Sequence, residues 1–248
     1  MMELKVIGTG SEGNCYLLQD HESYLSLDAG AKYKDVQVGC DFHVGKIAGC
    51  LVTHAHKDHC QQIPKYKKAI IDCFSGADAI QPIARATGTL IFGLKDRKWN
   101  PIAAWSVLPF EVPHENEPNY GYLVEAPSGH KLMYLTDFEY CRYTFRRMHL
   151  NTILIACNHL DDITDRQDEI IEKRGKAYFE HIIRGHSSLS VVKMCIEANR
   201  TEDLKNVILC HLSEENASAE QMQRAIKRLV GKSVAVHVAT KGKVIELG

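Results

Sequence analysis

Four side chains that can bind metal ions lie within one short run, His54-Ala55-His56-Lys57-Asp58-His59. The run follows Leu51-Val52-Thr53, so it stands at the carboxyl end of an expected strand. In an extended segment, residues two apart face the same side, so His54 and His56 can converge on one metal ion. A turn into a helix at Asp58 would direct Asp58 and His59 toward a second ion. This density of ligands predicts a metal site.

Three more candidate ligands stand where later strands are expected to enter loops. His114, Asp137 and His211 each follow a run of mostly apolar residues. In α/β sheets, ligands gather at the carboxyl ends of the strands, so we expect these three side chains to join the dense run. The predicted metal ligands are therefore His54, His56, Asp58, His59, His114, Asp137 and His211.

Short runs rich in β-branched and aromatic residues, bounded by Gly or Asp, predict two sets of strands. The expected strands are Leu4–Ile7, Cys15–Gln19, Tyr24–Asp28 and Cys50–Thr53, then Gly121–Glu125, Lys131–Leu135, Thr152–Ala156, Val207–Cys210, 234–239 and 243–247. Helices are expected near His59, from Ser75 with Ser75-Gly-Ala-Asp78 as a cap, and over 165–181, 188–199 and 218–229. This order suggests one α/β domain, residues 1–248, with two sheets face to face and helices outside.

The composition limits the classes of function. The net charge of −1 excludes a strongly basic protein that wraps nucleic acid, although a local basic groove stays compatible with it. No apolar stretch approaches the roughly 20 residues that span a bilayer, so no membrane partner is expected. The first residues lead straight into a strand pattern without a secretory signal, so we expect a cytoplasmic location. The oligomeric state is left open, with a homodimer among the options.

The nine cysteines form no Cys-x-x-Cys pair. Their odd number and their positions within apolar strands predict reduced, buried thiols rather than a disulfide framework. We expect Cys210, next to His211, to pack as a small core residue and not to bind metal.

The whole pattern resembles the metallo-β-lactamase superfamily. The resemblance rests on the His-x-His-x-Asp-His run, on Leu27-Asp28-Ala29-Gly30, and on the later His114, Asp137 and His211. It implies a four-layer αββα sandwich with two metal ions between the sheets. It also implies that His54, His56 and His114 hold one ion, that Asp58, His59 and His211 hold the other, and that Asp137 bridges them. Asp28 would then be a neighbour of the site and not a ligand.

Other segments are similar to the YycJ type, a nuclease-like branch that is also common in phages. They are Gly8-Thr-Gly-Ser-Glu-Gly-Asn14, Cys157-Asn158-His159, Arg184-Gly185-His186-Ser187 and His211-Leu-Ser-Glu-Glu-Asn216. That branch typically has Asp after the His of its third motif, where this chain has Glu115, and Asn-His-Asp where this chain has Leu160. These differences concern the substrate side of the site more than the metal side.

The resemblance also assigns roles around the metals. Catalytic roles are expected for Asp58 and for His186, which could donate a proton to the leaving oxygen, bind a phosphate oxygen, or only cap a helix. His159 is expected to orient a metal ligand. Candidate substrate contacts are Asn14, Asn158 and Ser187. The basic and aromatic runs 65–68 and 142–147 could follow a polyanion, although a solvated helix face explains them equally well.

Two divalent ions, Zn²⁺ or Mn²⁺, can generate a bridging hydroxide near neutral pH and stabilise both sides of an in-line displacement. The Asp58-His59 pair is typical of phosphodiesterases, nucleases and thioester hydrolases in the superfamily. The leading hypothesis is a nuclease that cleaves DNA or RNA. The alternatives are a small-molecule phosphodiesterase, for instance a cyclic nucleotide hydrolase, and a non-catalytic descendant that binds nucleic acid or protein.

Overall fold

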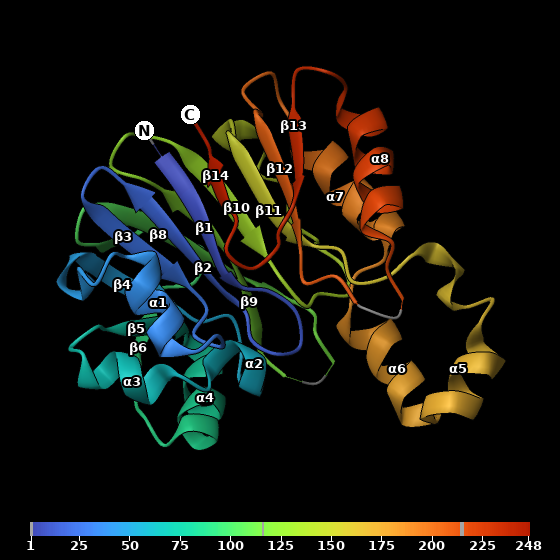
Figure 1. Ribbon diagram of the computed structural model, residues 1–248, viewed down its shortest axis with the longest axis horizontal. Helices are drawn as coiled ribbons and strands as arrows, with labels where there is room; N and C mark the ends of the chain where they lie inside the picture. Colours follow the sequence, from blue (N-terminus) through green and yellow to red (C-terminus); the bar gives the residue numbers. More distant parts are fainter. Residues whose placement is uncertain (1, 116, 214–215) are drawn as a thin grey trace.

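Two seven-stranded sheets lie face to face in the computed structural model, which describes residues 2–115, 117–213 and 216–248 (Figure 1). The first sheet has the order β14-β1-β2-β3-β4-β5-β6. Strands β1 to β3 pair antiparallel, whereas β3 to β6 run parallel. The bounds are β14 Val244–Glu246, β1 Met2–Gly8, β2 Cys15–Asp20, β3 Ser23–Leu27, β4 Ile47–Leu51, β5 Cys73–Gly76 and β6 Phe92–Leu94.

The second sheet repeats this mixed pattern in the order β13-β12-β11-β10-β9-β8-β7. Strands β7 to β10 pair antiparallel, and β10 to β13 run parallel. The bounds are β13 Ala235–Val238, β12 Asn206–Cys210, β11 Thr152–Ala156, β10 Lys131–Leu135, β9 Asn119–Glu125, β8 Trp105–Val112 and β7 Asn100–Ile102. Parallel strands place their carboxyl ends at one edge, which is where the predicted ligands follow β4, β10 and β12.

Helices cover the outer faces of both sheets, as Figure 1 shows. On the first sheet lie α1 Tyr33–Gly39, α2 Lys57–Cys60, α3 Ile63–Lys68 and α4 Ile80–Thr87, and on the second α7 Leu189–Asn199 and α8 Ala219–Val230. Helices α5 Gln167–Arg174 and α6 Lys176–Gly185 pack on each other beyond the end of the second sheet. Short 3₁₀ turns occupy Val44–Lys46, Ala77–Ala79, Arg146–Met148 and Asp161–Ile163. The expected αββα sandwich is confirmed.

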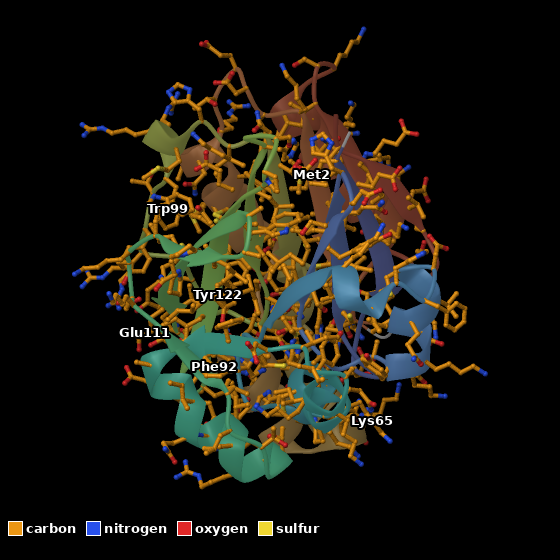
Figure 2. All side chains as sticks on the ribbon, turned by 90° about the vertical axis from the view of Figure 1, so that its left-hand side faces the viewer. Met2, Lys65, Phe92, Trp99, Glu111 and Tyr122 are labelled. Carbon is orange, nitrogen blue, oxygen red and sulfur yellow. The ribbon has the colours of Figure 1, made fainter. Side chains whose placement is uncertain are left out.

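Large buried aromatic side chains hold the two sheets together. Tyr16 of β2 and Tyr134 of β10 meet edge to face, with ring centroids 5.7 Å apart. The Tyr122 side chain of β9 lies inside the molecule (Figure 2), and its hydroxyl donates to the carbonyl of Val52 across the sandwich at 2.6 Å. Such aromatic pairs add about 0.5–1.5 kcal/mol to the burial of their area. These contacts fix the segment after β4, which carries the dense ligand run.

Two helix predictions differ from the structure. Ser75 belongs to β5, and its hydroxyl donates to the Val52 carbonyl at 2.7 Å, so α4 begins only at Ile80 and has no cap at Ser75. The expected helix over 165–181 is two helices, because Gly175 has a φ of +89° that an uninterrupted helix cannot contain. No helix in the described part of the chain is long and apolar enough to cross a membrane. That residues 1–248 form one domain stays a prediction.

Candidate metal centre

The dense run follows β4 as an extended segment and then turns into α2, as its sequence predicts. His54 and His56 stand before the helix, and His56 has an extended backbone with φ −63° and ψ 143°. Their rings meet the ring of His114, which follows β8 of the other sheet, and the three ring centroids are 4.6–4.8 Å apart. The ring nitrogens of His114 and His56 approach to 3.2 Å. We call these three residues the histidine group.

Asp58 and His59, in α2, meet the two ligands expected from the other sheet. Asp58 Oδ2 is 3.3 Å from Nε2 of both His59 and His211. Asp137 Oδ2 is 2.9 Å from His59 Nε2 and 3.6 Å from His211 Nε2. The four candidate ligand atoms lie within 4.8 Å of one another, as do those of the histidine group. We call Asp58, His59, Asp137 and His211 the carboxylate group.

The donor atoms fit divalent metal ions. His54 Nε2 is fully buried and has no hydrogen-bond partner among the described residues, which would be costly for a nitrogen with no further ligand. Burial and the neighbouring His59 and His114 lower the pKa of His54 well below its ordinary value, so its imidazole is neutral, the form that binds metal. The same atom lies 3.7 Å from Asp137 Oδ2. A ligand set of imidazoles and carboxylates suits Zn²⁺ and Mn²⁺.

The carboxylate group stays ionised although it is buried. Burial alone would raise the pKa of Asp137, but His211 and His59 hold it well below its ordinary value. Burial also opposes protonation of His59, but Asp58, Asp28 and Asp137 raise its pKa well above the usual value. Opposite charges therefore stabilise one another in the metal-free protein. Metal binding must displace a proton from this group.

Asp28 lies behind the ligands and fixes the orientation of His59. Its Oδ2 accepts from His59 Nδ1 at 2.7 Å and from the Tyr134 hydroxyl at 2.6 Å. Its Oδ1 accepts from the backbone N–H of Thr53 at 2.8 Å. A carboxylate on the outer nitrogen of a ligating histidine sets the tautomer and directs the inner nitrogen to the metal. The geometry therefore places Asp28 as a neighbour of the ligands.

Left-handed backbone conformations recur at the site. Asp28, Asp137 and His211 have φ values of +60°, +47° and +49°. Such conformations cost about 1–3 kcal/mol each in non-glycine residues and persist when neighbouring contacts enforce them. Asn119 Nδ2 donates to the Asp137 carbonyl at 2.6 Å, and Thr9 Oγ1 accepts from the His211 N–H at 3.0 Å. These bonds aim ligand side chains from strand ends into the space between the sheets.

Comparison with known proteins gives the family. Residues 41–211, well over half of the chain, match the model described as a beta-lactamase superfamily domain. The chain belongs to the beta-lactamase superfamily.

Solved structures of metallo-beta-lactamase fold proteins share its fold. The protein YhfI from Bacillus subtilis is 16% identical, with a TM-score of 0.73 and 98% of each chain covered. A diphosphatase from the PhnP family is 13% identical, with a TM-score of 0.70 over 99% of this chain and 98% of that one. Human tRNase Z, short form, is 14% identical, with a TM-score of 0.65 and 99% of each chain covered.

Two of the three residues expected to touch substrate are buried behind the ligands of this superfamily site. Asn14 is fully buried, and its Nδ2 donates to Asp58 Oδ2 at 3.2 Å and lies 3.1 Å from His59 Nε2. Ser187 is also fully buried, and its hydroxyl donates to the Ala156 carbonyl at 2.9 Å. Neither side chain offers a substrate any exposed surface in this structure. For Asn14 and Ser187, a role in positioning neighbouring groups therefore fits the structure better than the expected contact with substrate.

Asn158 lies between the ligands and a neighbouring cavity. Its Nδ2 donates to His211 Nδ1 at 3.0 Å and to Asp137 Oδ1 at 3.4 Å. Asn158 also lines a cavity of about 470 Å³, together with His186 and His211. A substrate role and a ligand-orienting role are both compatible with this position.

His159 is buried, and its Nδ1 donates to the carbonyl of Leu160 at 2.8 Å. Its backbone pairs with Ser188 beside the 184–187 segment. Its ring contacts no ligand in any hydrogen bond that the described residues show. The expected orienting role therefore has no direct contact to support it, and His159 instead helps to hold the segment that carries His186.

His186 ends α6 and faces the centre. Its ring centroid is 5.9 Å from that of His211 and 4.8 Å from that of His181. His186 does not begin α7, because Ser188 caps that helix by accepting from the Val191 N–H at 3.3 Å. It is instead the C-terminal cap residue of α6, where its N–H donates to the Ile182 carbonyl at 3.2 Å. Burial lowers the pKa of His186 to about 3, so its imidazole is neutral in the metal-free protein. The ring therefore lines the cavity beside His211 as a neutral imidazole that can donate one hydrogen bond.

Sequence reasoning missed the pair formed by His181 and Glu115. His181 Nδ1 donates to the Glu115 carboxylate, and its ring centroid lies 6.5 Å from that of His56. His181 had no motif around it, and Glu115 stood out only by replacing an expected Asp. Their sequence separation of 66 residues hides the contact until α6 is placed. The signal that could have indicated His181 was its position five residues before His186, near the end of the same helix.

The two basic and aromatic runs offer no free aromatic faces. Tyr66 is fully buried and shares a hydrogen bond of 2.9 Å with Ser26. Phe145 packs on Phe110, with ring centroids 4.6 Å apart, and Tyr143 packs against the same core cluster. The cavity beside the metal centre is lined by neither run. Core packing explains the aromatic residues, and two of the basic ones have partners within the protein: Arg142 pairs with Glu111 at 3.0 Å, and Lys67 lies over the ring of Phe92.

Proposed function

We propose that the protein is a metal-dependent phosphodiesterase that works with two divalent ions. The observation that carries the proposal is the position of Asp137. Its Oδ2 lies 3.7 Å from His54 Nε2 in the histidine group, and 2.9 Å and 3.6 Å from His59 and His211 in the carboxylate group. One carboxylate oxygen between two ligand groups is the arrangement that two adjacent ions share.

The histidine group would hold one ion and the carboxylate group the other, with Asp137 shared between them. When bound, two such ions lower the pKa of a water and neutralise charge on phosphoryl oxygens. Asp58 serves as a permanent anion, because His59 and His211 outweigh the effect of burial and keep its pKa well below the usual range. Asp28, Thr53 and Asn14 keep the rings of His54 and His59 in place.

His186 would bind the phosphate rather than supply a proton. The sequence suggested a proton donor with an ordinary histidine pKa, but burial lowers the pKa of His186 to about 3. A neutral imidazole still donates one hydrogen bond, and a bond to a charged oxygen is the stronger kind. His181, held by Glu115, lies beside His186 and limits its movement.

Nucleic acid, DNA or RNA, is the first substrate that we propose, because the nuclease-like motifs of the sequence surround the centre. Human tRNase Z, which shares the fold, is named for action on RNA. A small phosphodiester, for instance a cyclic nucleotide, is the second candidate. The cavity of about 470 Å³ beside His211 favours it, since pockets of roughly 300–1,000 Å³ take small molecules. The diphosphatase with the same fold is in keeping with a small phosphate substrate.

The test is hydrolysis by protein loaded with Zn²⁺ or Mn²⁺. Bis-p-nitrophenyl phosphate, single- and double-stranded DNA, RNA, a panel of cyclic nucleotides and a p-nitrophenyl thioester would be compared in one buffer. We expect phosphodiester hydrolysis that depends on added metal and that a chelator abolishes. If protein with both ions bound cleaves the thioester but no phosphodiester, the proposal is wrong.

A further inference from the structure

The cavity beside the metal centre has two chemically different ends. At one end lie His211 of the carboxylate group and His186, together with Asn158. The glycine-rich loop between β1 and β2 forms one wall, and Tyr178 of α6 lies on another (Figure 1 shows both elements). The cavity is therefore lined by one candidate metal ligand and by residues from parts of the chain that contribute no ligand.

The remaining charged side chains of the cavity are mostly cations. Lys32, Arg174 and Lys241 line it, and Glu12 is the carboxylate that lines it among the described residues. They come from three distant parts of the sequence, so no basic run in the sequence announces them. Net positive charge in a concave site raises the local concentration of anions. The cavity thus offers positive charge in addition to any supplied by metal ions.

Lys241 is held in position by its partner. Its Nζ lies 2.6 Å from Asp35 Oδ2, and Asp35 stands in α1, the helix that Lys32 immediately precedes. The ion pair therefore ties the turn between β13 and β14 to the start of α1, on the same side of the cavity as Lys32. An ammonium group has three donors, so Lys241 can bind Asp35 and a further anion together.

We propose that this cavity binds a nucleotide unit and that Lys32 and Lys241 bind a second phosphate, one sugar away from the phosphate at the metal centre. The volume of about 470 Å³ suits a group of nucleotide size. A phosphate suits paired ammonium groups because it presents several charged oxygens without a fixed planar geometry. This inference rests on the proposed phosphodiesterase function and adds a substrate class to it. The second phosphate belongs to a free nucleotide or to the terminal nucleotide of a strand.

The test is binding, measured by isothermal titration calorimetry on protein loaded with Zn²⁺. The probes are thymidine 5′-monophosphate and thymidine 3′,5′-bisphosphate, which differ only in the second phosphate. We expect the bisphosphate to bind about tenfold more tightly, because two exposed charge pairs contribute modestly. In the double variant Lys32→Ala/Lys241→Ala, this advantage should fall to within about twofold. Both lysines are exposed, so the variant should fold, and its melting temperature checks this.

The control is Lys34→Ala, which removes an exposed lysine from α1, two residues from Lys32, but does not line the cavity. It should keep the tenfold advantage. Equal affinity of the two probes for the unmodified protein, or an advantage that survives in the double variant, would overturn the proposal. Hydrolysis of bis-p-nitrophenyl phosphate is measured separately, so its absence contradicts the proposed function without deciding the binding result.

A 5′-phosphorylated thymidine tetranucleotide separates the two sources of the second phosphate. If it binds as tightly as the bisphosphate, and loses affinity in the double variant, the subsite accepts the end of a strand. If only the bisphosphate shows the dependence on the two lysines, the subsite accepts a free nucleotide. Either result supports the subsite. A tetranucleotide and a bisphosphate that both ignore the lysines would contradict it.

Discussion

The two halves of the metal centre are held together by different forces. The histidine group contains only imidazoles, and burial lowers the pKa of His54 and His114 within it. Its His54 Nε2 has no partner among the residues that the structure describes. The carboxylate group contains two anions, and its histidines are paired with them at 2.9–3.6 Å. One half therefore leaves a buried ring nitrogen, His54 Nε2, that a metal ion could satisfy, whereas the other satisfies itself through ion pairs.

This contrast implies an order of metal binding. Two carboxylates give the carboxylate group more negative charge, so we expect it to bind its ion more tightly. The histidine group should lose its ion first. The variants below test this contrast, beginning with the one that should affect both halves.

The largest effect is expected for Asp137→Ala, since the Asp137 carboxylate lies within 3.7 Å of ring nitrogens in both groups. The rate of bis-p-nitrophenyl phosphate hydrolysis should fall more than about a hundredfold. That exceeds the roughly 10- to 100-fold loss typical when a residue that only orients a ligand is removed. Metal content, measured by elemental analysis, should fall from close to two ions per chain. The exposed Asp96→Ala is the control and should change neither quantity. Full activity with two ions bound would show that Asp137 is not shared.

Removal of one ligand from the histidine group should separate the two halves. In His56→Ala we expect about one ion per chain, retained by the carboxylate group, and phosphodiesterase activity reduced by roughly a hundredfold or more. Elemental analysis after dialysis against a weak chelator measures the content. Loss of both ions from this variant would break the proposed order, because it would mean that the groups bind metal only together.

A change behind the carboxylate group should have a smaller effect. Asp28→Asn replaces a carboxylate that accepts from four donors by a group with one acceptor oxygen, so the orientation of His59 is lost. Metal affinity of the carboxylate group should fall by about 10- to 100-fold. Competition with a metal-binding dye measures it. Unchanged affinity, with the fold intact, would mean that Asp58 and Asp137 orient His59 without help.

His186→Ala tests a residue that touches neither half as a ligand. Loss of one hydrogen bond to a charged oxygen should lower kcat/KM by roughly tenfold to a hundredfold, with both ions retained. Because the pKa of His186 is lowered to about 3, the loss should be equal for an activated nitrophenyl ester and for an ordinary phosphodiester. A smaller loss on the nitrophenyl ester would restore the proton-donor role that the sequence suggested. Unchanged rates on both would remove His186 from the mechanism.

The smallest effect concerns His130, a partly buried histidine outside the centre, where no metal ion is expected to influence the pKa. Burial lowers the pKa of His130 to about 4, below the roughly 6.5 of an unfolded chain. A histidine with a depressed folded pKa stabilises the protein above pH 6.5, and this stability is lost as pH falls toward 4. In metal-free protein, His130→Gln should flatten the decrease of melting temperature over this window by a few °C. An unchanged decrease would assign the acid sensitivity to the metal centre.

The sequence predicted which candidate ligands come together better than it predicted their surroundings. His54, His56, Asp58 and His59 are neighbours in the chain, so strand and helix periodicity alone bring them together. His114, Asp137 and His211 required only the rule that strands end at one edge. The surroundings depend on side chains that are distant in sequence, such as Tyr134 and Asp28, which are 106 residues apart.

The positions where helices begin and end could not all be predicted from the local sequence pattern either. Residues 165–181 have a continuous helical pattern, yet Gly175 adopts a positive φ and lets α6 return toward the centre. That turn brings His181 to Glu115 and His186 to His211. A glycine permits such a turn, but the packing of α5 on α6 decides whether it forms.

By itself, the sequence determined the ligand run, the alternation of strands and helices, and therefore the family, because these depend on spacing along the chain. Only the tertiary structure decided which charges meet around the cavity. Lys241 and Asp35 are 206 residues apart, and they form an ion pair because β14 pairs with β1 and carries the preceding turn to α1. The physical reason is that burial, pKa and electrostatic potential at a site depend on distances in space, which local sequence patterns do not contain.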